Sequence, residues 1–152
     1  MYKRQLLVPG EILWIDVVLP RGDRRWSDDV GRAAHWLGEV WATALRACGV
    51  DGAQVHTGPM ERSTWSSLVC FAGRGPGEVF VDGRKAVGIS QRRTRGGARF
   101  QCAVHRRWDP ARLVSLLAEP RPTVAELTGL VAEVDVPLAD VATAVETELS
   151  LA

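Results

Sequence analysis

The sequence predicts an α+β fold in which a mixed or antiparallel sheet packs with helices. Three observations predict it: an apolar run at residues 11–19 rich in Ile, Val and Trp, a helical apolar repeat at residues 27–49, and an Asp82-Gly83 pair between two strand-like runs. The chain has 152 residues, of which 46% are apolar and 24% charged. It is therefore long enough for one domain with its own core.

The first two elements follow from the apolar pattern. Residues 11–19 are predicted to form a buried strand that stops at Pro20. Residues 27–49 are predicted to form a helix, because Ser27 suits the N-cap and Gly49 suits the C-terminal stop. The apolar positions that recur at helical spacing are Val30, Ala33, Leu37, Val40, Trp41, Ala44 and Cys48.

The middle of the chain predicts a sheet made by local pairing. A short strand is expected at residues 53–56, and residues 78–105 predict a three-stranded antiparallel meander. Asp82-Gly83 is typical of a tight hairpin turn, and the segment 94–97 is expected to make the second turn. The glycine-rich segment 73–78 matches no phosphate-binding loop and is interpreted as a mobile loop that covers a pocket.

Helices are predicted for the C-terminal part. Asp109-Pro110 is expected to cap and begin a helix that runs to about Leu117. Thr123 and Glu126 have the spacing of a capping box, which predicts a helix through residues 127–134, and Pro137 is expected to open the last helix. Residues 119–152 are accordingly interpreted as a C-terminal helical segment that follows a main domain at residues 6–118.

Lys85 is the most informative charged residue. The chain has 17 arginines and only two lysines, Lys3 and Lys85. A lysine ammonium is a compact point charge that can follow a reacting oxygen, whereas arginine is a planar fork. A lysine retained against this bias suggests the point-charge role. The alternative is a solvated lysine on a hairpin.

Two other groups of residues have alternative interpretations. Cys70 lies in an apolar run, where most cysteines are inert, and a nucleophilic Cys70 would need a nearby cation such as Lys85. The arginines of the segment 91–95 could contact phosphate or form a solvated edge that discourages strand pairing. The three histidines show no metal-ligand spacing.

Composition limits the partners. The net charge of +1 argues against general binding to nucleic acid, and no apolar run approaches the length of a membrane span. Neither a nucleic acid nor a membrane is therefore expected as a partner. The three cysteines contain no CxxC pair, which is typical of a reducing compartment and predicts a cytoplasmic protein.

These residues together resemble the lipoate–protein ligase A family of the biotin/lipoate ligase superfamily. The resemblance is carried by a C-F dipeptide, a G-R-K hairpin with a following G-x-S-Q, and a glutamine on the next strand, and it covers residues 6–118. The matching residues are Cys70, Phe71, Gly83, Arg84, Lys85, Gly88, Ser90, Gln91 and Gln101. The implied fold is a class II biotin/lipoate ligase-like catalytic domain.

The resemblance implies a defined activity. Such enzymes activate lipoate with ATP and Mg2+ to lipoyl-adenylate, and then transfer the lipoyl group to a lysine of a carrier domain. The carriers are lipoyl domains of 2-oxoacid dehydrogenases or the glycine cleavage H protein. Lys85 matches the lysine that contacts the acyl carboxylate and the adenylate phosphate. The implied ligand-binding residues are Gly83, Arg84, Gly88, Ser90 and Gln91.

The sequence departs from the family at two places. The family's R-R-x-x-G-G-G motif is expected directly before residue 6, where residues 1–5 read MYKRQ. These five residues are interpreted as foreign, and the catalytic domain as incomplete at its N-terminus. The histidine of the family's Q-H-G motif is replaced by Cys102, so no role is transferred to it.

Two alternatives to the ligase stay open. One branch of the superfamily moves octanoyl groups from acyl carrier protein through a cysteine thioester, and Cys70 matches that cysteine. The chain would then be an octanoyltransferase that uses no ATP. The second alternative is an inactive, truncated homologue that only binds carrier domains.

Overall fold

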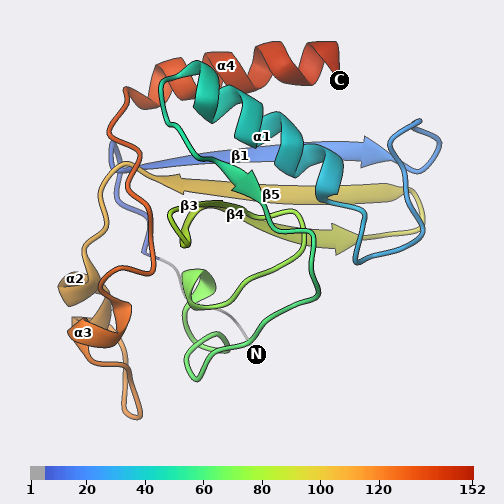
Figure 1. The fold of residues 1–152 in the computed structure, drawn as a ribbon. Coiled ribbons are helices and arrows are strands. Elements are labelled where there is room, and N and C mark those ends of the chain that lie inside the picture. Colours follow the sequence, from blue (N-terminus) through green and yellow to red (C-terminus); the bar gives the residue numbers. More distant parts are fainter. Residues whose placement is uncertain (1–5) are drawn as a thin grey trace.

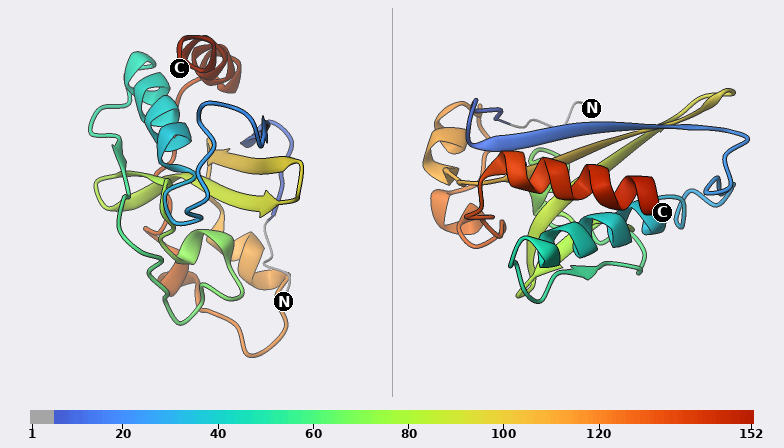
Figure 2. Two further views of the ribbon diagram at one scale, coloured as in Figure 1. Left: turned by 90° about the vertical axis from the view of Figure 1, so that its right-hand side faces the viewer. Right: turned by 90° about the horizontal axis from the view of Figure 1, so that it is seen from above.

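The computed structural model describes residues 6–152, and it confirms the predicted α+β fold. Five antiparallel strands form one sheet in the order β1-β5-β4-β3-β2. Helices α1 and α4 lie side by side over one face of this sheet, whereas α2 and α3 lie together at one end (Figures 1 and 2). The interpretation of residues 1–5 as foreign lies outside the described residues. The elements are β1 (Ile12–Pro20), α1 (His35–Ala47), β2 (Gln54–Val55), η1 (Cys70–Ala72), β3 (Val79–Val81), β4 (Arg84–Arg93), β5 (Gly97–His105), α2 (Pro110–Ser115), α3 (Val124–Leu127) and α4 (Leu138–Leu151).

The core lies between α1, α4 and the face of the sheet beneath them. The apolar stripe of α1 is fully buried at Leu37, Trp41 and Leu45. The stripe packs against alternate residues of β1, β4 and β5, as the two-residue period of a strand requires. The opposite face of the sheet bears a different set of side chains, which β-strand register places in one row at Trp14, Ala103 and Gly88.

Helix α1 begins eight residues later than predicted. The sequence predicts a start at Ser27, but residues 27–34 form turns and the helix starts at His35, with no side-chain cap at Ala34. The Asp29 carboxylate accepts the N–H of Gly31, at 2.8 Å, which favours a local turn over a helical turn.

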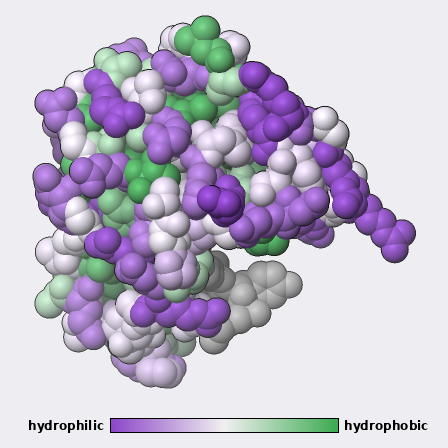
Figure 3. Space-filling model, turned by 45° about the vertical axis from the view of Figure 1, so that its right-hand side comes forward, coloured by the Kyte–Doolittle hydropathy of each residue, from purple (hydrophilic) through white to green (hydrophobic). Residues whose placement is uncertain are grey.

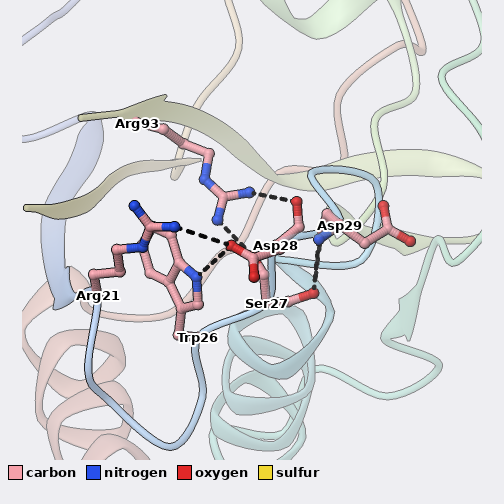
Figure 4. Close-up of polar contacts among 6 residues, drawn as sticks. All are labelled: Arg21, Trp26, Ser27, Asp28, Asp29 and Arg93. Atoms are coloured by element: carbon pink, nitrogen blue, oxygen red, sulfur yellow. Dashed lines mark hydrogen bonds and ion pairs between the residues drawn. The ribbon is translucent and has the colours of Figure 1, made fainter. Parts of the chain in front are cut away.

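A contact with β4 holds this turn segment in place (Figure 4). The Arg93 guanidinium donates hydrogen bonds to the carbonyls of Ser27 and Asp28 and lies 4.3 Å from the centre of the Trp26 ring. Tertiary contacts of this kind override local helix propensity. Arg93 therefore has a structural role, which differs from both interpretations of the segment 91–95.

The hairpin predicted at Asp82-Gly83 is confirmed. Asp82 and Gly83 have φ of +49° and +74°, as a two-residue turn with both central residues in the left-handed region requires. The turn places Val81 opposite Arg84, and Lys85 follows as the second residue of β4.

The C-terminal part confirms some predicted elements and corrects one. Asp109 caps α2, the capping box of Thr123 and Glu126 is present, and α4 follows Pro137. However, α3 ends at Leu127, so the predicted helix through residues 127–134 is wrong. Residues 130–134 instead run extended beside the sheet, where the N–H of Lys85 donates to Leu130 and the N–H of Ala132 donates to Lys85, each at 2.9 Å.

His105, the last residue of β5, makes the fold sensitive to acid. Its ring lies between Phe71 and Trp108, and burial lowers its pKa from 6.5 to about 4. Between these two pH values the unfolded chain binds a proton that the folded chain excludes, so stability falls as pH falls. We expect the free energy of unfolding to decrease by about 3 kcal/mol from pH 6.5 to 4 through this residue.

Urea titrations at a series of pH values measure this effect. The variant His105→Gln should remove most of the slope above about pH 5.5, where carboxylates contribute little. An unchanged slope in that variant would assign the acid sensitivity to other groups.

Candidate functional site

Two cavities meet beside Lys85. The first has a volume of about 370 Å³ and lies between the segment 60–75 and the start of β4. The second has a volume of about 590 Å³ and lies over the face of the sheet that α1 and α4 do not cover. Both cavities are lined by Met60, Cys70, Gly75 and Glu78.

The Lys85 amine is buried in the wall of the first cavity. Its side chain is only 2% exposed, and Nζ lies 2.7 Å from Oε2 of Glu78. Nζ also donates to the carbonyl oxygen of Cys70 at 3.3 Å. The rings of Phe71 and Phe80 flank it, with centres 5.5 and 5.9 Å from Nζ. The alternative of a solvated hairpin lysine is therefore wrong.

Glu78 is a site residue that sequence reasoning missed. Its carboxylate is buried next to the Lys85 amine, and it accepts backbone N–H groups from Gly75 at 2.6 Å and Ile89 at 3.3 Å. The sequence places Glu78 at the boundary between the predicted mobile loop 73–78 and the predicted meander 78–105, and gives it no role in the site. The signal that could have identified it is its position directly before the buried run Val79–Val81, where an unpartnered charge is unfavourable.

Cys70 lies at the junction of the two cavities. It begins the short helix η1, and its half-buried side chain lines both cavities. The next residue, Phe71, packs onto the uncovered face of the sheet against Ala103. The segment that carries Cys70 is thereby fixed directly above β4 and β5.

Gly88 permits this packing of Phe71. A Cβ atom at Gly88 would lie 3.2 Å from two ring atoms of Phe71, which is tighter than an ordinary contact. The absence of a side chain at Gly88 therefore lets the Phe71 ring lie against the strand. Gly88 also lines the second cavity with Ser90 and Gln91, so three of the predicted ligand-binding residues are gathered there.

The other two predicted ligand-binding residues lie elsewhere. Gly83 and Arg84 are exposed in the hairpin turn, and neither lines the two cavities. Arg84 lines a separate hollow of about 320 Å³ with Trp108 and Glu133. The structure thus gathers Lys85, Cys70, Gly88, Ser90 and Gln91 but not the first two residues of the G-R-K motif.

The glycine-rich segment 73–77 is anchored, whereas the sequence predicts a mobile loop. Arg74 and Glu61 exchange two backbone hydrogen bonds of 2.8 and 2.9 Å, and the N–H of Gly77 donates to His56 at 2.8 Å. Gly77 has φ of +87° and touches α1, where a Cβ would lie 2.6 Å from the carbonyl oxygen of Ala34. The segment therefore forms a fixed wall of both cavities.

The chemical character of the two cavities differs. The first combines the Lys85–Glu78 ion pair with hydroxyl groups, from Ser63, Ser66 and Ser67. The second is more apolar, with walls that include Trp14, Phe71 and Ala103. An elongated molecule with an apolar chain in the second cavity and an anionic end in the first fits this arrangement, because the ammonium lies in the wall of the first cavity.

The surface and the metal-binding potential are also informative. On the face shown in Figure 3, hydrophilic residues dominate and hydrophobic ones form small groups.

Within residues 6–152, no three His, Cys, Asp or Glu side chains lie close enough to hold a metal ion. None of the helices in the same range is long and apolar enough to cross a membrane.

Comparisons with known proteins identify the fold. No protein-family model and no curated protein matches the sequence. Among solved structures, a lipoate protein ligase from Thermoplasma acidophilum with bound lipoic acid aligns with a TM-score of 0.64 and 19% identity, over 93% of this chain and 51% of that chain.

Two further solved structures agree. Lipoate-protein ligase A bound with ATP aligns with a TM-score of 0.64 and 19% identity, over 92% of this chain and 51% of that one. The bi-partite lipoate protein ligase of T. acidophilum, studied with its E2 lipoyl domain, aligns with a TM-score of 0.64 and 18% identity, over 93% and 51%. The chain thus spans about half the length of these structures, and its fold is that of the lipoate–protein ligases.

Proposed function

We propose that this chain forms the acyl-transfer part of a lipoate–protein ligase. In this proposal lipoate is activated with ATP and Mg2+ to lipoyl-adenylate, and the lipoyl group then passes to a lysine of a carrier domain. The observation that carries the proposal is the Lys85 ammonium, which is buried in the wall of the first cavity against Glu78 and Cys70, two residues that line both cavities. The ligase fold supports it.

The chemistry explains why a buried ammonium is useful. In the first step the lipoate carboxylate attacks the α-phosphate of ATP and pyrophosphate leaves, so negative charge grows on the phosphate. In the second step the carrier lysine attacks the acyl carbonyl, an oxyanion forms, and AMP leaves. A fixed positive charge in a site that excludes water stabilises both anionic transition states.

The ligands are distributed between the cavities in this proposal. The apolar walls near Phe71 would hold the acyl chain, with Gly88, Ser90 and Gln91 along its length. In this proposal magnesium arrives with the nucleotide phosphates, which supply most of its protein-independent ligands. Gly83 and Arg84 lie outside both cavities and are proposed only as part of the turn that places Lys85.

The proposed partners are carrier domains. One similar structure is a lipoate protein ligase studied with its E2 lipoyl domain. We extend this to the present chain and propose lipoyl domains of 2-oxoacid dehydrogenases or the glycine cleavage H protein as acceptors. The reaction is best measured as ATP–pyrophosphate exchange that depends on lipoate, and as a mass increase of an apo lipoyl domain. If the wild-type chain gives neither pyrophosphate exchange nor a mass increase of the lipoyl domain, the ligase function is contradicted.

A second function is favoured by the position of Cys70. This cysteine lines both cavities, and its carbonyl oxygen accepts a hydrogen bond from Lys85 Nζ at 3.3 Å. A thiolate near this ammonium could attack an octanoyl thioester, release the carrier thiol, and then pass the octanoyl group to a lysine. This is the octanoyltransferase alternative, which needs no ATP.

The variant Cys70→Ser distinguishes the two functions. For the ligase we expect ATP-dependent transfer to fall by less than about threefold, because the hydroxyl fits the same space and no covalent step uses the thiol. For the transferase we expect an octanoyl adduct on the wild type, visible by intact mass, and its loss in the variant. A carrier domain that binds without either reaction would indicate the inactive homologue.

A further inference from the structure

The Glu78 carboxylate joins three parts of the site. Oε2 lies 2.7 Å from Lys85 Nζ and accepts the N–H of Gly75 at 2.6 Å, while Oε1 accepts the N–H of Ile89 at 3.3 Å. The glycine-rich wall, strand β4 and the amine are therefore bound to one side chain, which is itself only 9% exposed.

The register of the sheet explains how Glu78 reaches this position. Pairing between β3 and β4 ends at Val79 and Val87, with a shift in register between Val79 and Phe80. Ile89 lies beyond the last pair, so its N–H on that side needs another acceptor. The Glu78 side chain supplies it, and the carboxylate consequently points along β4 toward Lys85.

The negative charge of Glu78 is shared among more groups than the Lys85 ammonium. A buried ammonium without a nearby carboxylate would tend to lose its proton. The Glu78 carboxylate, however, is shared between the ammonium and two backbone N–H groups, which disperse its negative charge. The pair can therefore keep Lys85 protonated without cancelling the positive field that the amine presents to the cavity.

We propose that Glu78 is the positioning residue of this site: its carboxylate keeps the Lys85 amine protonated and aimed at the junction of the two cavities. This inference rests on the proposed function of Lys85. A purely structural role is less suited to the geometry, because a well-packed apolar pair would stabilise the same position at least as well. The pair also lines a cavity.

The first test measures the pH at which Lys85 loses its proton, and it needs no assay of activity. The chain has only two lysines, so selective ¹⁵N and ¹³C labelling of lysine gives two side-chain signals, and Lys3→Arg assigns them. In Glu78→Gln we expect the Lys85 signal to titrate at least about one pH unit lower than in the wild type. Glu61→Gln is the matched control, because Glu61 is exposed and pairs with half-buried Arg74 at 3.8 Å, not with Lys85, so the titration should be unchanged.

The second test measures kcat and KM for acyl transfer. In Glu78→Gln we expect kcat for acyl transfer to fall at least tenfold with KM for the acyl substrate changed less than threefold, because the amine is displaced while the apolar cavity remains. Glu78→Asp keeps a carboxylate but moves it, so the Lys85 titration should stay near that of the wild type while kcat falls. Should Glu78→Gln not fold, Glu78→Asp decides, and wild-type kcat in it would overturn the proposal.

The outcomes separate this inference from the proposed function. An unchanged Lys85 titration together with wild-type kcat in Glu78→Gln overturns the role of Glu78, even if Lys85 is essential. A shifted titration in a protein whose wild type transfers no acyl group supports the role of Glu78 in holding the charge, while the ligase function falls.

Discussion

Replacement of Lys85 by arginine is expected to lower the rate of acyl transfer at least tenfold, on the order of 1.4 kcal/mol in the activation free energy. The substitution retains the charge but not its shape. Lys85 is 2% exposed, and its amine lies between two aromatic rings and 2.7 Å from Glu78. A guanidinium is larger and planar, so it cannot occupy this space with its charge at the same point. Steady-state transfer to an apo lipoyl domain measures the change.

The neighbouring residue provides the control for this experiment. Arg84→Lys exchanges the same two residue types in the opposite direction at an exposed position of the same hairpin. We expect its activity to stay within about twofold of the wild type. Circular dichroism establishes that Lys85→Arg is folded. Full activity of a folded Lys85→Arg would remove the reason for assigning the point-charge role to this lysine.

Replacement of Gly77 by alanine is expected to lower the free energy of unfolding by roughly 3 kcal/mol. This loss is the sum of backbone strain and overpacking. Gly77 has φ of +87°, and its Cβ would lie 2.6 Å from both the Cβ and the carbonyl oxygen of Ala34. The facing residue Gly38 also packs tightly against Gly77, because a Cβ at Gly38 would lie 2.3 Å from the Gly77 carbonyl oxygen. Chemical denaturation with guanidinium chloride measures the loss.

A second glycine separates the two causes. Gly52 has φ of +73°, but a Cβ there would meet no atom within 4 Å. Gly52→Ala should therefore show the strain alone, about 1 kcal/mol. Equal losses in Gly52→Ala and Gly77→Ala would contradict a close contact between the glycine-rich wall and α1. Because that wall lines both cavities, Gly77→Ala should also reduce acyl transfer.

Local patterns predicted the fold well where the interactions are local. The Asp82-Gly83 hairpin, the capping box at Thr123 and the meander of β3, β4 and β5 each depend on residues close in sequence, and all are present. Prediction was wrong where distant residues decide the conformation. Arg93 holds the segment that was expected to begin α1, and Lys85 and His105 bond to the segment expected to extend α3.

The candidate site shows the same division. The bias against lysine drew attention to Lys85 by a count of residue types, and the family resemblance then gave it a role. The same count could not identify Glu78, because its importance comes from a shift in strand register that brings Ile89 and Lys85 to one carboxylate. Likewise, the family resemblance implied only that Gly88 binds a ligand. The structure adds that Gly88 also leaves room for the Phe71 ring, which depends on how η1 lies on the sheet.

The burial of Lys85 has a consequence for the protein's own integrity. In the proposed reaction, the activated acyl group would react with any unprotonated amine that it meets, including amines of the protein itself. Lys85 is the only lysine in residues 6–152, and in our proposal the Glu78 carboxylate, 2.7 Å away, holds it as a non-nucleophilic ammonium. A surface that carries arginine in place of lysine offers few amines for such an acyl group to modify, so under the proposed function the rarity of lysine would protect the protein from acylating itself.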